Sequence, residues 1–230
     1  MNSITHIGSH RSARASLASL ASFFALSAAV TFVGCNNDPA KGKAQATVAS
    51  AAEAVAAPAA GAVNYAFSND GSKVEFVGAK VTAKHDGSFT TFHGTIGVVD
   101  GDASKSSVNA DIDVASLTVE PAKLAAHLKT PDLLDAAKFP KATFASTAIK
   151  AGGGDAPGAT HTVTGNLTLH GVSKAITFPA KIKIEGDSVS VDAEFAINRK
   201  DFGIVYPGMP DDLIKDDVLI KLTLHAKKTG

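Results

Sequence analysis

Residues 161–185 read HTVTGNLTLHGVSKAITFPAKIKIE, and this stretch decides the fold. Apolar side chains take alternate positions on both sides of a break at residues 170–173, and they are Val163, Leu167, Leu169, Ile176, Phe178, Ala180, Ile182 and Ile184. A period of two places side chains on one face of a strand, so the stretch predicts a hairpin with one buried face. Each arm has about ten residues, which is longer than most strands in globular proteins. Such arms favour a strongly coiled sheet that closes around an interior.

The same alternation recurs through the rest of residues 64–228. We expect further strands near residues 65–67, 73–83, 88–99, 108–114, 141–151, 189–197 and 218–226. Asp86-Gly87 reads as a hairpin turn between two of them. Residues 120–137 instead have near-helical spacing of leucines and predict one or two short helices. The fold class is therefore all-β, an antiparallel up-and-down barrel of about eight strands with one short helical excursion.

The N-terminal residues 1–34 have the layout of a secretory signal of the lipoprotein type. Arg11 and Arg14 precede an apolar run, Leu17–Val33, and the chain's single cysteine, Cys35, follows. We expect residues 1–34 to be a signal peptide and Cys35 to be lipidated, which would hold the protein on an envelope membrane facing the periplasm. The alternatives are an uncleaved anchor and a plain signal followed by an unmodified cysteine.

Residues 35–63 contain Ala, Gly, Lys and Pro but almost no large apolar side chain. A segment of this composition cannot bury a core. We therefore expect a flexible tether between the anchor and the barrel domain of residues 64–228, with at most a transient helix over Ala44–Ala57.

Charge and motifs exclude several classes of function. Lys plus Arg and Asp plus Glu each number 22, and a near-neutral chain lacks the basic stripe that nucleic-acid binding requires. The chain has no Gly-x-Ser-x-Gly, no His-Glu-x-x-His and no phosphate loop, so we expect neither an enzyme nor a cofactor. The eight histidines are scattered, and no metal site is predicted.

Four motifs resemble those of the YceI-like family, and the resemblance covers roughly residues 64–228. They are LKTPDLLD (128–135), KFPKATF (138–144), VTGNLTLHGVSK (163–174) and NRKDFGI (198–204). Members of this family are periplasmic or secreted lipocalin-like barrels that bind a polyisoprenoid lipid or an amphiphile in the lumen. The resemblance thus implies a carrier or buffer of a long-chain isoprenoid or similar lipid, with a homodimer among the oligomeric states left open.

The apolar faces of the predicted strands provide the candidate ligand-binding residues. These are Phe76, Phe92, Phe144, Leu167, Phe178 and Phe195. Small residues share the same faces, among them Gly78, Gly165 and Ala193, and favour space left inside. The alternative is a filled barrel that acts as a structural or interaction module and partners an envelope or membrane redox complex.

Arg199 is the only arginine after the predicted signal peptide. Its planar fork makes paired hydrogen bonds that lysine cannot make, so a lone arginine in a polar loop indicates a specific partner. That partner is a lipid head group at the barrel mouth or, as we favour, Asp201 or a loop carbonyl that fixes residues 199–204.

Overall fold

The computed structural model describes residues 38–52 and 61–229. The chain divides into two units, residues 1–35 and 36–230, and every described residue belongs to the second. The predicted signal peptide and Cys35 lie outside the described residues, so both stay predictions. Within the described ranges, no helix has the length and apolarity needed to cross a bilayer.

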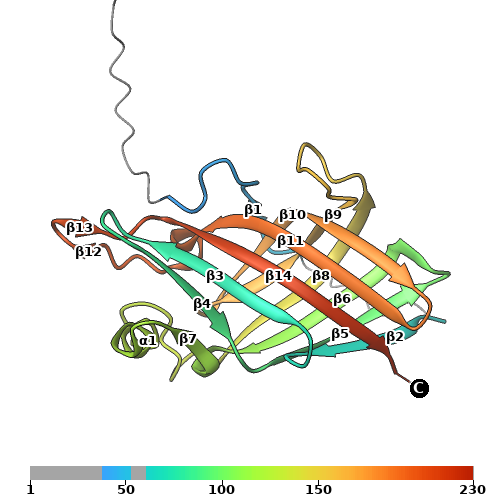
Figure 1. Cartoon of the computed structure of the whole chain (residues 1–230), viewed down its shortest axis with the longest axis horizontal. Helices are drawn as coiled ribbons and strands as arrows, with labels where there is room; N and C mark the ends of the chain where they lie inside the picture. Colours follow the sequence, from blue (N-terminus) through green and yellow to red (C-terminus); the bar gives the residue numbers. More distant parts are fainter. Residues whose placement is uncertain (1–37, 53–60, 230) are drawn as a thin grey trace, which may run out of the picture. The chain divides into compact units, whose positions relative to one another are not determined.

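Eight strands form a closed antiparallel barrel (Figure 1). Each strand pairs with the next one in the series, and the last pairs back to the first. The series is β2 (Val63–Ser68), β5 (Phe92–Val99), β6 (Asp102–Asp113), β8 (Lys141–Ala151), β9 (His161–Leu169), β10 (Val172–Glu185), β11 (Ser188–Asn198) and β14 (Asp217–Lys228). The predicted all-β up-and-down barrel is confirmed.

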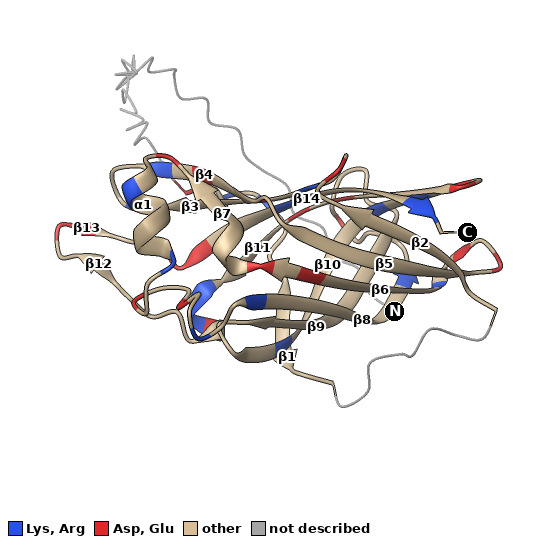
Figure 2. Cartoon of the chain, turned by 90° about the horizontal axis from the view of Figure 1, so that it is seen from below, with Lys and Arg blue, Asp and Glu red and all other residues tan. Residues whose placement is uncertain are grey.

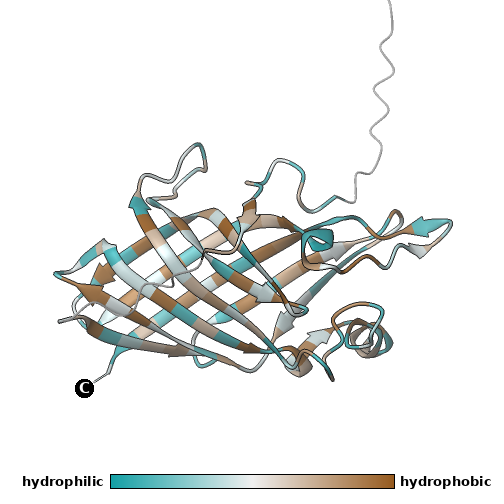
Figure 3. Ribbon diagram, turned by 180° about the vertical axis from the view of Figure 1, so that it is seen from behind, coloured by the Kyte–Doolittle hydropathy of each residue, from teal (hydrophilic) through white to brown (hydrophobic). Residues whose placement is uncertain are grey.

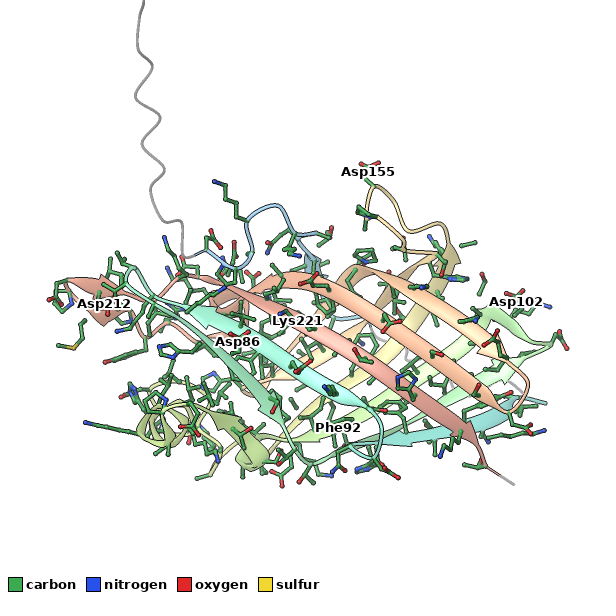
Figure 4. All side chains as sticks on the ribbon, viewed as in Figure 1. Asp86, Phe92, Asp102, Asp155, Asp212 and Lys221 are labelled. Atoms are coloured by element: carbon green, nitrogen blue, oxygen red, sulfur yellow. The ribbon has the colours of Figure 1, made fainter. Side chains whose placement is uncertain are left out.

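Hydrophobic and hydrophilic residues alternate along these strands (Figure 3). In β14, Ile220, Leu222 and Leu224 line the interior, whereas Lys221 lies outside and His225 is exposed. Figure 4 shows Lys221 on the outer surface of the wall. The alternation read from the sequence therefore assigns the correct face in this strand.

Three further strands extend the wall at one end of the barrel. They are β3 (Lys73–Ala79), β4 (Lys84–Phe89) and β7 (Leu117–Val119), and β3 pairs with the first half of β14. The turn predicted at Asp86-Gly87 is wrong, because both residues lie inside β4. A Cβ at Gly87 would come within 2.6 Å of Cε1 of Phe76 on β3. Gly87 therefore leaves room for the ring of Phe76 to pack against the backbone of β4, and it does not mark a turn.

The same end carries the helical excursion and the irregular segment between β11 and β14 (Figure 1). The predicted excursion at residues 120–137 contains one α-helix, α1 (Ala122–Leu128), and a 3-10 turn that was not predicted, η1 (Val114–Ser116), precedes it. Between β11 and β14 lie η2 (Arg199–Phe202) and a small hairpin of β12 (Gly208–Met209) and β13 (Asp212–Leu213). We call this end, which holds α1, η2 and the hairpin, the mouth end. Asp212 at this end and Asp102 at the other mark the two ends in Figure 4.

The barrel wall contains a seam between β10 and β11. The two strands pair only through residues 181–185 and 188–192, and toward the mouth end they are no longer partners. The carbonyl of Ala180 accepts a hydrogen bond from Thr160 on the β9 side. Because successive residues of a strand point their backbone groups to opposite edges, Pro179 presents its nitrogen toward β11, and that nitrogen has no hydrogen to donate.

The seam is filled by residues 44–50. Here β1 (Thr47–Ser50) pairs antiparallel with β10. On the other side, the amide of Ala46 donates to the carbonyl of Ala196 in β11, and the amide of Ala196 donates to the carbonyl of Ala44, both at 2.8 Å. Ala46 is only 4% exposed. The segment therefore satisfies backbone groups on two strand edges that would otherwise be unpaired.

The flexible tether predicted for residues 35–63 is corrected for residues 38–52. Besides the strand pairing, Asn166 holds Ala52 with two side-chain hydrogen bonds of 2.9 Å. Lys43 also forms an ion pair of 2.9 Å with Glu194. Small and polar residues carry no apolar periodicity, so the strand could not be read from its own sequence. It forms because two open edges are available to it.

Candidate functional site

A cavity of about 280 Å³ lies inside the barrel. Close-packed interiors tolerate only a few voids larger than a water molecule, and an engineered cavity of roughly 150 Å³ already admits benzene. All six candidate residues predicted from the apolar faces line this space: Phe76, Phe92, Phe144, Leu167, Phe178 and Phe195. The described barrel is therefore hollow, contrary to the alternative of a filled one.

The hollow interior explains why several inward side chains are not fully buried. Phe144, Leu167, Ile220 and Leu222 line the cavity yet are only half-buried, although they face away from the outer surface. In a packed core these positions would be fully covered. The uncovered apolar surface is what a hydrocarbon ligand would bury.

The cavity is closed at the end opposite the mouth end. Tyr65, Ile96, Val98, Val189 and Ala226 are each no more than 5% exposed and fill that end. The hydroxyl of Tyr65 also donates a 3.0 Å hydrogen bond to the carbonyl of the β10–β11 turn. The lumen therefore has one blocked end.

Toward the mouth end, the cavity lining includes residues that the sequence did not assign to the site. Leu128 and Leu133 come from the helical excursion, and Ile204 and Ile214 come from the segment between β11 and β14. These residues lie in irregular structure, where no alternation indicates which side chains turn inward. The leucines were recognised only as a helical pattern.

Not every small inward residue creates free space. A Cβ at Gly165 would lie 2.6 Å from the carbonyl oxygen of Ala145 and would clash with the ring of Phe144. Gly94 is similarly covered by a neighbouring ring. Gly78 differs, because it lines the cavity and a Cβ there would meet nothing within 4 Å. Only some of the small residues predicted to leave room therefore do so.

Arg199 is the one charged residue that lines the cavity, and it is 5% exposed. Its Nε donates to the carbonyl of Lys215 at 3.1 Å, and its Nη1 donates to the carbonyl of Ile204 at 2.6 Å. Its Nη2 donates to Oδ1 of Asp216 at 3.3 Å. Burial lowers the pKa of Arg199, and the charge of Asp216 opposes that shift. The guanidinium thus ties η2 to the segment before β14.

This geometry supports the loop-fixing role that we favoured, through the predicted loop carbonyl. Asp201 is not the partner of Arg199, because its side chain is exposed and the carboxylate that accepts from the guanidinium is that of Asp216. Arg199 and Asp216 are 17 residues apart, and the antiparallel pairing of β11 with β14, in which Asn198 lies opposite Asp217, brings them together. No sequence pattern indicated this contact.

Titratable side chains do not converge on the cavity. Over residues 38–52 and 61–229, no group of three or more His, Cys, Asp or Glu side chains could hold a metal ion. The arrangement is suited to holding an apolar molecule by surface contact. A closed antiparallel barrel with a single apolar lumen defines a lipocalin-like binding barrel.

Residues 65–226 match the YceI-like domain, and the chain belongs to the YceI-like family. It is 35% identical over 146 residues to a UPF0312 protein of Pseudomonas putida (strain W619), across 58% of this chain and 74% of that protein. It is 37% identical over 124 residues to Protein YceI of Salmonella arizonae, across 51% of this chain and 62% of that protein. The resemblance read from the four motifs is confirmed.

Solved structures of similar fold include the crystal structure of BcnA of Burkholderia cenocepacia. The two chains have a TM-score of 0.60 and 28% identity, across 69% of this chain and 98% of BcnA. A second is a polyisoprenoid binding domain from Saccharophagus degradans that is implicated in plant cell wall breakdown. Its TM-score is 0.56 at 14% identity, across 73% of this chain and 99% of that domain, which is a likeness of fold alone.

Proposed function

We propose that the protein is a carrier or buffer that holds a long-chain isoprenoid or a similar amphiphile in its lumen. The observation that carries this proposal is the 280 Å³ cavity, whose lining is apolar apart from Arg199. Burial of hydrocarbon contributes about 0.8 kcal/mol per CH₂, so a long chain binds there without a dedicated polar contact. A solved domain of the same fold that is described as polyisoprenoid binding supports this ligand class.

We also propose that acylated Cys35 anchors the protein to an envelope membrane on its periplasmic side. The signal layout of residues 1–34 and the position of the only cysteine support the anchor. In this proposal the protein is not an enzyme, and the bound lipid is its only ligand. Replacement of Cys35 by serine should move the protein from the membrane fraction to the soluble fraction or leave an unprocessed precursor.

The ligand is tested by extraction of the purified protein with organic solvent, followed by mass spectrometry. The protein should be purified without detergent from the Cys35→Ser chain, so that membrane lipid does not accompany the anchor. We expect one class of lipid with a long hydrocarbon chain, at about one molecule per protein. A heat-precipitated sample, extracted in parallel after washing, controls for lipid on the outer surface. Absence of lipid from the folded protein would contradict the proposal.

A further inference from the structure

Exposed apolar side chains gather at the mouth end of the barrel. Among the described residues, five large hydrophobic side chains are exposed, and four of them belong to this end. These four are Val81 (53% exposed), Val205 (63%), Met209 (62%) and Leu213 (49%), which we call the mouth patch. The fifth, Val63, begins β2 at the opposite end. Single exposed apolar residues are ordinary in soluble proteins, but their concentration at one end is not.

The mouth patch adjoins the cavity through the chain itself. Ile204 and Ile214 line the cavity, and the residues next to them, Val205 and Leu213, are exposed. The amide of Val81 donates to the carbonyl of Leu213 at 3.1 Å, which places the β3–β4 turn beside the hairpin. Apolar groups therefore lie immediately inside and immediately outside the mouth. A hydrocarbon chain that left the lumen here would meet apolar side chains first.

The described chain begins near this same end. Asp217, the first residue of β14, has a raised pKa, mainly through burial and next through the negative charge of Asp38. Gln45 lies beside Ala196 in β11, two residues before Asn198, which pairs with Asp217. Residues 38–52 are fixed in place by the seam, so Asp38 is not the end of a long free linker. Cys35 is three residues before Asp38 in the sequence, and three residues span at most about 11 Å of extended chain.

We propose that the mouth patch docks on the surface of a lipid bilayer, so that the lumen opens directly onto the membrane. The proposal rests on the proposed function in one respect, because acylation of Cys35 would hold the mouth end close to the membrane. Both signs of charge surround this end, including the ion pair of Lys80 with Asp212 (Figure 2). Attraction to anionic lipid is therefore not required, and apolar contact supplies the binding.

The test uses the fact that Cys35 is the chain's only cysteine. In the Cys35→Ser chain, Met209→Cys and, in a second protein, Val63→Cys are labelled with a polarity-sensitive fluorophore. Vesicles of equal parts phosphatidylcholine and phosphatidylethanolamine are then added. We expect a blue shift and an intensity gain at position 209 and no change at position 63. No change at 209, or equal changes at both positions, would overturn the proposal.

A matched pair of charge variants measures the same contact without a label. Met209→Asp combined with Leu213→Asp should lower vesicle partitioning by about tenfold or more, because two apolar side chains lose their contact with lipid. Val63→Asp should leave partitioning unchanged. All these positions are exposed, so the variants should keep the circular dichroism spectrum of the parent chain. Equal partitioning of the two variants would contradict docking through the mouth.

Two further results separate docking from its competitors. A blue shift at position 209 that grows with protein concentration in the absence of vesicles would assign the patch to a second copy of this chain and overturn the proposal. A shift on vesicles in a protein that yields no extractable lipid would uphold docking and refute the carrier function. Extractable lipid in a protein that shows no shift on vesicles would uphold the carrier function and refute docking.

Discussion

The rings of Phe178 and Phe195 stack with centroids 4.1 Å apart and planes inclined by 15°. Backbone pairing between their strands has already ended at Lys181 and Asp192. Continuation of that register would place the two phenylalanines directly opposite each other, so side chains hold the strands together where the backbones no longer pair. Phe144 adds a third ring at 5.8 Å from Phe178. These rings form the lumen wall behind the seam that β1 fills.

Removal of one ring of this stack should cost stability. Phe195 is 3% exposed, and Phe195→Ala should lower the free energy of unfolding by about 3 kcal/mol through lost burial and lost stacking. Phe76 lines the same cavity but is half-buried, so Phe76→Ala should cost clearly less. Urea titration followed by circular dichroism measures both. If both variants lost the same free energy of unfolding, the stacking of Phe195 on Phe178 would add no stability of its own.

Two glycines of the inner face should respond differently to a methyl group. Gly165→Ala forces the ring of Phe144 to move and should cost roughly 1–3 kcal/mol by overpacking. Gly78→Ala meets open space and should be neutral or slightly stabilising, because alanine restricts the unfolded chain. Thermal unfolding of the two variants measures the difference. A destabilised Gly78→Ala would show that the lumen near the mouth is filled.

Asp216 lies just before β14 and Asp217 is its first residue. Their carboxylates should have opposite effects on the stability of the fold. Burial, Asp38 and Asp216 raise the pKa of Asp217, so folding favours its protonated form. The ionised form therefore costs stability above the raised pKa, and this cost disappears as the pH falls below the unfolded value of about 3.9. Asp217→Asn should raise the melting temperature at pH 7 and leave it unchanged near pH 3.

Asp216→Asn is the matched control for that substitution. Asp216 accepts from Arg199 at 3.3 Å and pairs with Lys200 at 2.8 Å. Loss of these contacts should lower stability at pH 7 by about 1 kcal/mol, since one partner is buried and the other is exposed. A melting temperature that falls in Asp217→Asn as well would contradict the assignment of Asp217 as a group that opposes folding when ionised.

The seam strand should detach when a charge is placed under it. Ala46 is buried against β11, so Ala46→Asp would bury a carboxylate without a partner. Residues 38–52 should then exchange their amide hydrogens much faster, while the strands of the barrel keep their protection. Ala49→Asp, at an exposed position of β1, should leave exchange unchanged. Hydrogen exchange read by mass spectrometry decides the matter, and equal exchange in the two variants would refute the docked segment.

The parts of this fold that follow from local periodicity were predictable. The inward faces of β10, β11 and β14, and with them Phe178 and Phe195, follow from a period of two. The seam strand was not predictable, because its sequence is small and polar and its stability comes from the edges of other strands. Asp216 was missed because it lies in an irregular segment without periodicity, and it meets Arg199 only through the register of β11 with β14. Asp86-Gly87 was predicted to be a turn because the local sequence does not reveal that the ring of Phe76 packs against Gly87.

The central claim is that the lumen holds a lipid, and native mass spectrometry of a lumen-filling variant tests it most directly. Gly78 lines the cavity and has free space beside it, so Gly78→Phe should place a ring where the lipid lies and leave the barrel folded. We predict that the wild-type barrel and Gly78→Ala carry one lipid each, and that Gly78→Phe is folded but empty. A wild-type protein with no added mass, or a Gly78→Phe protein that keeps the same lipid, would contradict the account.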